Sequence, residues 1–465
     1  MAGRLTFHAF TELGWTDGEG GAWRNPALTP PRTVPELEFW TGLARVAERG
    51  RLDSFFFADA MGMGGFTPSD QEREVRDGRL ILWDPAVAIP ALAAATEHIG
   101  FLFTSSILQE HPFTFARKAS TLDHLTNGRV GWNIVTSYSP NVARNFGMDD
   151  LPPREERYRW ADEYVDVAYR LWEGSWEEDA VVADAATGVY VDPAKVHPID
   201  YAGERYRVQG PHLTYATPQR TPLLVQAGGS PAGRAFAARH AEMQFITAPD
   251  PESAAKDIAA VRRLAARAGR RPDDICFTIS TGFVVGSTEE EARRKADDLD
   301  SYADFAGKVA AISTSIGVDL TGLEPDAPVS ELLAGATSSG GMSGVLKSLI
   351  GSLPTDRPPT LRDLIRPRGD RHGGVGTPEQ IADQLERWQR AGVGGVAVGM
   401  DVRPGSLTDF VDHVIPVLQD RGLAQREYAP GTLRQRVLGY GDRLPDRHPA
   451  ARHRRGSRTA GERHS

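Results

Sequence analysis

The chain has 465 residues, of which 40% are hydrophobic and 25% are charged, with a formal charge of −9. This composition is typical of globular proteins, and the acidic balance argues against nucleic acid as a partner of the folded body. No apolar run approaches the roughly 20 residues that cross a bilayer. The single cysteine, Cys276, excludes a disulfide framework and is expected to be a core thiol. The start MAGRLTFHAF has no signal-peptide core, so we expect a cytoplasmic protein.

Eight segments have the β-branched, aromatic and small residues of buried strands. They are Leu5–Phe10, Ser54–Asp59, Ile99–Ser105, Arg129–Thr136, Pro222–Ala227, Met243–Thr247, Ile275–Val285 and Gly394–Gly399.

Helical patterns lie between most of these strands and after the last one. They are Pro35–Arg49, Pro85–Glu97, Phe113–Leu125, Glu155–Trp172, Pro231–His240, Pro251–Ala268, Thr377–Ala391 and Leu407–Gln419. Strands that alternate with helices indicate parallel pairing with right-handed crossovers. Eight such units favour a (β/α)8 TIM barrel, and an open doubly wound sheet is the structural alternative.

We predict one barrel domain over residues 1–440, with insertions at about 60–83, 176–221 and 289–376. Loops of this length inside a compact fold are usually functional or disordered. The last insertion follows the seventh strand, on the face where barrel active sites form, so we predict that it is a lid. A tolerated insertion without a role is the alternative. Residues 441–465 are rich in arginine and poor in apolar side chains, which predicts a disordered basic tail.

Polar side chains recur where four consecutive strands end. Asp59 ends the second strand, Thr104 and Ser106 follow in the third, Asn133 and Thr136 belong to the fourth, and Gln226 and Ser230 follow the fifth. The carboxyl ends of barrel strands meet at one face, so these groups should converge there. Short hydrogen-bonding groups beside apolar walls suit a planar heterocycle with many acceptors. Each of them alone could equally be an ordinary helix cap.

Ser230-Pro231 predicts the start of a helix, because serine is a favoured N-cap and proline a favoured first helical residue. Gly228 and Gly229 precede it and expose backbone amides. The N–H groups and dipole of such a helix start could hold a phosphate. Tyr158 could hydrogen-bond the same phosphate. A capping turn without a ligand is the alternative.

Several familiar sites are absent from the sequence. No GxGxxG opens a βαβ unit, and there is no GxxxxGK[ST], HExxH or paired CxxC. The histidines are scattered without ligand spacing. We therefore expect neither a nicotinamide fold nor a protein-bound metal.

The segments HPFTFARKASTLDHLTNGR (111–129) and GRVGWNIVTSYSPNVARNFG (128–147) look like the signature of the bacterial-luciferase-like flavin monooxygenases. Within that family the chain resembles the nitrilotriacetate, dibenzothiophene-sulfone and long-chain-alkane monooxygenase branch. The resemblance continues through blocks in one order over most of the chain. These blocks are 21–26, 43–59, 99–172, 226–242, 375–388 and 409–439.

The resemblance implies a TIM barrel that binds reduced FMN, supplied by a separate NAD(P)H:flavin reductase. With O2, the flavin would form a C4a-hydroperoxide and insert one oxygen atom into a small organic substrate. The residues implied around the isoalloxazine or ribityl chain are Asp59, Thr104, Ser106, Asn133 and Thr136. Those implied around the phosphate are Tyr158, Gly229 and Ser230.

Two positions depart from the family pattern. Arg154 stands where the family commonly has histidine, and Gly229 where it commonly has serine. Arg154 could still meet the phosphate as a fixed cation. Tyr138 and His8 are weaker candidates for polar contacts to the substrate, and either could be structural.

Two other functions stay open at this point. A deazaflavin-dependent hydride-transfer oxidoreductase would share the fold, and so would a flavin-binding barrel without turnover. The substrate cannot be inferred from the sequence, and neither can the oligomeric state, with which a homo-oligomer is compatible.

Overall fold

The structure is a computed structural model. It describes residues 3–15, 22–26, 36–63, 68–302, 304–316, 319–320, 322–330, 350, 353, 357–365 and 374–455.

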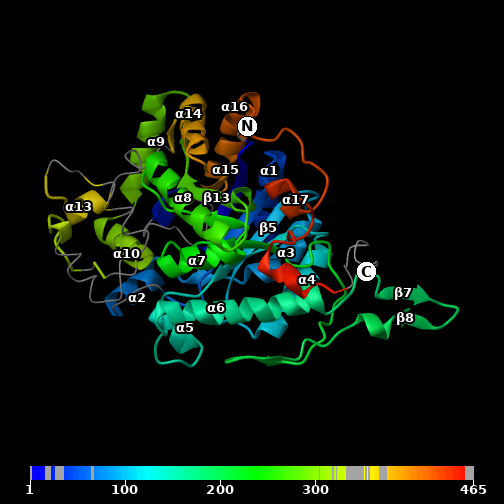
Figure 1. The fold of residues 1–465 in the computed structure, drawn as a ribbon. Helices are drawn as coiled ribbons and strands as arrows, with labels where there is room; N and C mark the ends of the chain where they lie inside the picture. The colour runs from blue at the N-terminus through cyan, green and yellow to red at the C-terminus, as the bar shows by residue number, and fades with distance from the viewer. Residues whose placement is uncertain are drawn as a thin grey trace.

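Eight parallel strands form a closed barrel, and the first strand pairs with the last to close it (Figure 1). The TIM-barrel prediction is confirmed, and each of the eight predicted segments contains a barrel strand. The prediction of one strand over Ile275–Val285 is wrong at its end, because the barrel strand stops at Gly282 and Val284–Val285 pairs outside the barrel. In order around the barrel the strands are β1 (Thr6–Glu12), β3 (Ser54–Ala58), β5 (Gly100–Ser106), β6 (Val130–Val135), β11 (Leu223–Gln226), β12 (Met243–Phe245), β13 (Cys276–Gly282) and β16 (Gly395–Gly399).

Helices surround the barrel as the alternating pattern predicted (Figure 1). Two of the helical stretches contain a π-helical turn, Arg170–Gly174 after α6 and Phe410–Val414 between α15 and α16. The helices that follow the successive barrel strands are α1 (Leu37–Arg49), α3 (Pro85–Ala94), α4 (Pro112–Leu125), α6 (Arg154–Tyr169), α7 (Pro231–His240), α8 (Pro251–Arg267), α14 (Pro378–Arg390), α15 (Gly405–Asp409) and α16 (Ile415–Asp420).

The side chains of each strand alternate between two cores. Trp132 of β6 packs outward, with its ring 4.4 Å from that of Phe115 on α4. Phe56 of β3 lies in a second cluster inside the barrel, where its ring stacks 5.1 Å from that of Phe245 on β12. The barrel is therefore a packed interior, and a ligand must bind above it.

The amino end of the barrel is closed by α17 (Leu433–Leu438). Leu433 packs where a side chain at Gly100 would lie, only 2.5 Å from the position of a Cβ atom there. Arg434 forms a fully buried ion pair with Glu242, with 2.6 Å between Nε and Oε1. Binding at this end is thus excluded by packing. Beside it, burial raises the pKa of the Cys276 thiol to about 11, as expected for a core thiol.

Residues 441–455 do not form part of a disordered tail, so that prediction is wrong for this stretch. They include the 3₁₀ helix Pro449–His453 and pack against the barrel. Arg447 Nε lies 2.7 Å from Asp274 Oδ2, and Arg454 Nε lies 2.8 Å from Glu173 Oε2. The sequence suggested that the arginines of this stretch are solvated. Arg447 and Arg454 instead form ion pairs with buried carboxylates. Residues 456–465 lie outside the described residues.

The three insertions contain short elements. The first holds α2 (Pro68–Arg76) and β4 (Ile81–Leu82), which pairs with β2 (Gly14–Trp15), and α5 (Pro140–Asn145) lies near it. The second holds the hairpin β7 (Val181–Asp184) and β8 (Val189–Val191) and the pair β9 (Tyr201–Ala202) and β10 (Arg207–Val208). The third holds α9 (Glu289–Tyr302), α10 (Phe305–Ile316), α13 (Leu361–Leu364) and β15 (Val375–Gly376), which pairs with β14 (Val284–Val285).

The insertion after the seventh strand has a small hydrophobic core of its own. Val309, Leu320, Val329 and Leu361 are buried together in it. Arg73 of α2 forms an ion pair with Asp304, so the first and third insertions meet. The glycine-rich stretch 335–344 lies outside the described residues. Among the helices that are described, none is long and apolar enough to cross a membrane.

Candidate active site

A cavity of about 360 Å³ lies at the carboxyl ends of β3, β5, β6, β11 and β12. This volume is within the range of small-molecule sites, and the position is that of active sites in barrel enzymes. Seven of the nine residues proposed for the cofactor line the cavity, and so does Tyr138. The seven are Asp59, Ser106, Thr136, Arg154, Tyr158, Gly229 and Ser230.

Thr104 and Asn133 are not among the residues that line the cavity. Asn133 Nδ2 donates to Thr104 Oγ1 over 2.9 Å, and Thr104 Oγ1 donates to the carbonyl of Phe57 over 3.0 Å. Both side chains are buried and join neighbouring strands. The remaining acceptor, Asn133 Oδ1, is buried without a hydrogen-bond partner among the described residues.

One end of the cavity is formed by the amino terminus of α7. Ser230 caps this helix as predicted, because its Oγ accepts from Gly233 N over 3.1 Å. The turn before it passes so close to Tyr158 that a Cβ atom on Gly228 would lie 2.2 Å from the Tyr158 hydroxyl. Glycine is therefore required at position 228 for this approach. The exposed amides of this helix start suit an anion.

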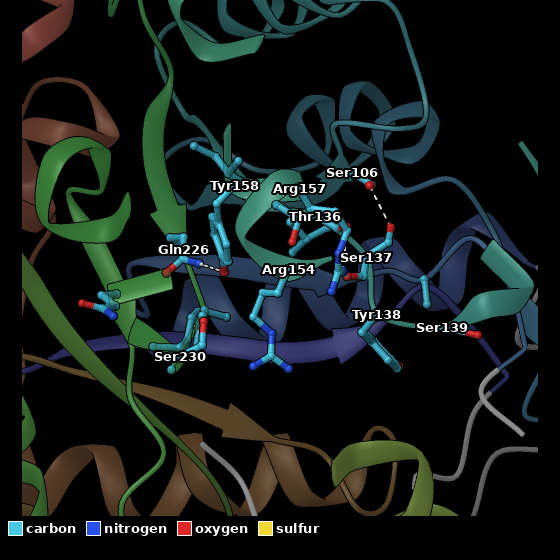
Figure 2. Close-up of a pocket in the computed structure, with 18 of the residues that line it drawn as sticks. Ser106, Thr136, Ser137, Tyr138, Ser139, Arg154, Arg157, Tyr158, Gln226 and Ser230 are labelled. Atoms are coloured by element: carbon cyan, nitrogen blue, oxygen red, sulfur yellow. Dashed lines mark hydrogen bonds between the residues drawn. The ribbon is translucent and has the colours of Figure 1, made fainter. Parts of the chain in front are cut away.

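A second helix start, that of α6, meets the same end of the cavity. Arg154 and Arg157 belong to its first turn and both line the cavity (Figure 2). A cation at a helix amino terminus is disfavoured by the helix dipole, so a bound anion would offset this cost. No carboxylate in the described part of the chain forms an ion pair with either arginine. This arrangement can hold a phosphate.

Arg157 also holds the loop that follows β6. It donates to the carbonyls of Thr136, Ser137 and Pro152, the first over 3.2 Å and the last over 3.1 Å. Ser137 has a left-handed φ of 60°, and its hydroxyl lies 2.8 Å from that of Ser106. These bonds fix a strained turn at the edge of the cavity, beside Tyr138 (Figure 2).

Asp59 lines the cavity, and the pKa of its carboxyl group lies near neutral pH. Burial, together with the negative charge of Asp84, raises the pKa of Asp59 to about 7. Gln109 and the amide of Ala60 hydrogen-bond the carboxyl group and oppose this shift. Asp59 can therefore bind or release a proton near neutral pH.

His8 does not line this cavity, and the structure gives it a structural role in place of a substrate contact. It is fully buried inside the barrel, where its ring nitrogens lie 3.0 Å from Thr6 Oγ1 and 2.8 Å from Ser54 Oγ. Burial lowers the pKa of His8 to about 4, so the ring is neutral.

Several lining residues were not singled out from the sequence, among them Gln109, Arg157, Arg234 and Gln244. Arg234 of α7 pairs with Asp257 of α8, with 2.9 Å between Nη2 and Oδ2. The sequence did contain one indication that Arg157 belongs to a site. A cation in the first turn of a helix is disfavoured by the helix dipole, so its presence there suggests a bound anion. Across the residues with described positions, no three His, Cys, Asp or Glu side chains form a metal-binding group.

The fold and the cavity together define a barrel enzyme that acts on a small molecule. Residues 22–395 match the family model described as luciferase-like monooxygenase. Dimethyl-sulfide monooxygenase of Hyphomicrobium sulfonivorans is 41% identical over 98% of this chain and 94% of the relative. Long-chain alkane monooxygenase of Geobacillus thermodenitrificans (strain NG80-2) is 38% identical over 93% of this chain and 94% of the relative.

The crystal structure of riboflavin lyase (RcaE) with modified FMN and substrate riboflavin is similar to this one, with a TM-score of 0.85 and 34% sequence identity. The similarity covers 97% of this chain and 100% of that one. The chain belongs to the luciferase-like monooxygenase family and is a monooxygenase. The resemblance to the branch that contains the alkane enzyme is confirmed.

Proposed function

We propose that this protein is the oxygenase component of a two-component monooxygenase that uses reduced FMN and O2 on a small organic substrate. The observation that carries the proposal is the meeting of two helix amino termini at one end of the cavity. Arg154, Tyr158 and Ser230 lie together there (Figure 2). Amides, a cation and hydroxyl groups at one point favour a phosphate, which is the group that FMN carries.

The rest of the cavity also fits FMN. The side-chain oxygens of Gln226 and Gln244 are buried without hydrogen-bond partners among the described residues, and both side chains line the cavity. Such acceptors are costly unless a ligand satisfies them, and the ribityl hydroxyl groups are suitable donors. Asp59, Ser106 and Thr136 would then face the isoalloxazine ring, with Thr104 and Asn133 supporting them from below.

The modified FMN in the riboflavin lyase structure supports this choice of cofactor. Bound reduced FMN would supply the chemistry, by forming a C4a-hydroperoxide with O2 that transfers one oxygen atom. The protein would position the flavin through Arg154, Gly229 and Ser230 and exclude water from the cavity. Asp59 would hold a proton beside the ring, and Tyr138 would contact the substrate from the loop after β6.

A separate reductase would supply the reduced flavin. Nitrilotriacetate monooxygenase component A of Aminobacter aminovorans is 33% identical over 427 residues, and its name describes one part of a system. The sequence has no motif for a nicotinamide cofactor. The isolated chain should therefore not oxidise NADH, even with FMN present.

The decisive experiment supplies the purified chain with a flavin reductase, NADH, FMN and ¹⁸O2 over a panel of uncharged and charged organic compounds. We expect one ¹⁸O atom in the product, measured by mass spectrometry, and no product without the reductase. Turnover under anaerobic conditions with a reduced deazaflavin would instead identify a hydride-transfer enzyme. Flavin binding with no oxygenation of any compound would favour a barrel without turnover.

The phosphate assignment has its own test. FMN should bind more tightly than riboflavin, and Arg154→Gln should narrow that difference by roughly 10- to 100-fold, the loss of one charge-assisted contact. Arg159→Gln, an exposed arginine on the same helix, is the control. Equal affinity of the native protein for FMN and riboflavin would remove the phosphate assignment.

A further inference from the structure

The phosphate end of the cavity contains a carboxylate as well as its arginines. Arg234 belongs to α7, and its Nη2 lies 2.9 Å from Oδ2 of Asp257 on α8. Both side chains line the cavity. This ion pair therefore lies in the wall of the proposed binding site, and its two charges cancel there.

Arg234 lies close to the start of α7, where the phosphate would bind. It follows the cap residue Ser230 by four positions, and its backbone N–H donates to the Ser230 carbonyl over 2.8 Å. Residues four apart lie on one face of a helix, and helical side chains lean toward the amino terminus. The Arg234 side chain is thus directed toward the end of the helix that Ser230 caps, which faces Arg154 in Figure 2.

Asp257 is placed at this site by α8. Val261, four residues further along the same helix, also lines the cavity and is buried. The side chains of Arg234 and Asp257 are both 30% exposed, so the pair lies at the edge of the cavity. A carboxylate in this position repels a phosphate and holds the guanidinium group that would otherwise attract it.

We infer that the Arg234–Asp257 ion pair limits the affinity of this protein for FMN, because Asp257 cancels the attraction between Arg234 and the phosphate. This inference rests on the proposed function, which places the phosphate at the start of α7. An oxygenase that receives reduced flavin from another protein must release oxidised flavin before the next turnover. A neutral ion pair at the phosphate end favours this release, since differences in affinity between variants of one site are mostly differences in dissociation rate.

The test is a series of variants that changes the charge of the pair in single steps. Dissociation constants of oxidised FMN and of riboflavin are measured by flavin fluorescence with the full-length protein, and the readout is the preference for FMN over riboflavin. Asp257→Asn should raise this preference by about 10-fold or more, because the Arg234 charge is then uncompensated. Arg234→Gln should lower it by a similar factor, because Asp257 remains. The double variant is neutral again and should return to within about twofold of the native preference.

Two control variants separate the charge from the structure of α8. Asp257→Glu keeps the carboxylate and should keep the native preference. Glu252→Gln removes an exposed carboxylate that pairs with Lys256 on the same helix, and it should also leave the preference unchanged. Because the Arg234–Asp257 pair is partly exposed, its loss should affect stability little, which Tm values of the variants check.

The rate of flavin release provides a second measurement. Oxidised FMN should leave Asp257→Asn about 10-fold more slowly than the native protein, as measured by stopped-flow fluorescence after dilution. A native preference for FMN that Asp257→Asn leaves unchanged would overturn this inference alone. An increase in preference that persists in the double variant would contradict the cancellation of one charge by the other. Equal binding of FMN and riboflavin by the native protein would overturn the proposed phosphate site, and this inference with it.

Discussion

The side-chain nitrogen of Gln226 lies 3.1 Å from the hydroxyl oxygen of Tyr158, and this hydrogen bond joins the end of β11 to α6. Both side chains are almost fully buried. Because the amide donates, the phenol proton of Tyr158 remains to be given to another acceptor. The end of β11, from which the chain turns into α7, is thus tied to α6 before any ligand arrives.

Tyr158→Phe should therefore weaken FMN binding more than riboflavin binding. Removing one hydroxyl donor to a charged group costs on the order of 1.5–3 kcal/mol. The measurement is the dissociation constant of each flavin. Tyr164→Phe is the control, because that hydroxyl on the same helix is buried without a partner among the described residues. An equal loss of affinity for FMN and for riboflavin would show that Tyr158 has a purely structural role.

Asp59 should make the stability of the protein depend on pH near neutrality. Its folded pKa of about 7 lies above the ordinary value of about 3.9, so the folded state binds more protons between these values. Its contribution is complete below pH 4 and is lost as the pH rises through 7. Asp59→Asn should therefore gain stability relative to the native chain between pH 5 and pH 8, measured by denaturant unfolding. Glu290→Gln, on an exposed part of α9, should show no such trend.

His8 should act with the opposite sign. Its pKa is lowered to about 4 from an ordinary value of about 6.5, so the unfolded state binds more protons between these values. Its contribution to the free energy of unfolding is complete above pH 6.5 and is lost as the pH falls through 4. His8→Asn should flatten the loss of stability between pH 7 and pH 4.5 and leave FMN affinity within about twofold. His98→Asn, where the side chain is 52% exposed, is the control.

If the insertion after the seventh strand is a lid, it should determine how much of the consumed O2 yields oxygenated product and how much yields hydrogen peroxide. Deleting residues 335–344 should leave flavin binding nearly intact, because the phosphate end comes from α6 and α7. It should lower the ratio of oxygenated product to hydrogen peroxide per reduced flavin consumed, because water would reach the cavity. A deletion variant with native ratio and native substrate affinity would show that the insertion is not a lid.

The C-terminal segment 441–455 should contribute directly to stability. Without it, the carboxylate of Glu173, which is fully buried, loses Arg454. An uncompensated buried charge costs on the order of 3–5 kcal/mol. Deleting residues 441–465 should lower Tm sharply in calorimetry, whereas deleting residues 456–465 removes no described contact. Equal Tm values for the two deletions would contradict this assignment.

The barrel could be predicted from the sequence because its strands are buried on both faces. Within the segment Arg129–Thr136, which follows a turn, residues 130–135 are apolar except for Asn133, and the structure gives β6 as Val130–Val135. The convergence of the polar strand ends could also be predicted, because the carboxyl ends of parallel strands meet at one face of a barrel. That Asp59, Ser106 and Thr136 line one cavity follows from topology alone.

The remaining features depend on contacts that no local pattern contains. The order of residues 441–455 comes from Asp274 and Glu173, which are distant in the chain. Gln244 of β12 and Arg234 of α7 line the cavity because the fold brings β12 and α7 to it, and no local sequence pattern indicates this. Thr104 was predicted at the right strand end, but its hydroxyl group bonds to Phe57 and does not reach the cavity.

The pairing of β1 with β16 has a consequence for synthesis of the protein in the cell. Thr6 lies beside Gly395, so the edge of the first strand has no partner until nearly four hundred residues have been made. Leu433 and Arg434, which fill the opposite end, are translated later still. A nascent chain on the ribosome therefore carries an open sheet edge for most of its elongation, and we expect the native state to form only after β16 and α17 have left the exit tunnel.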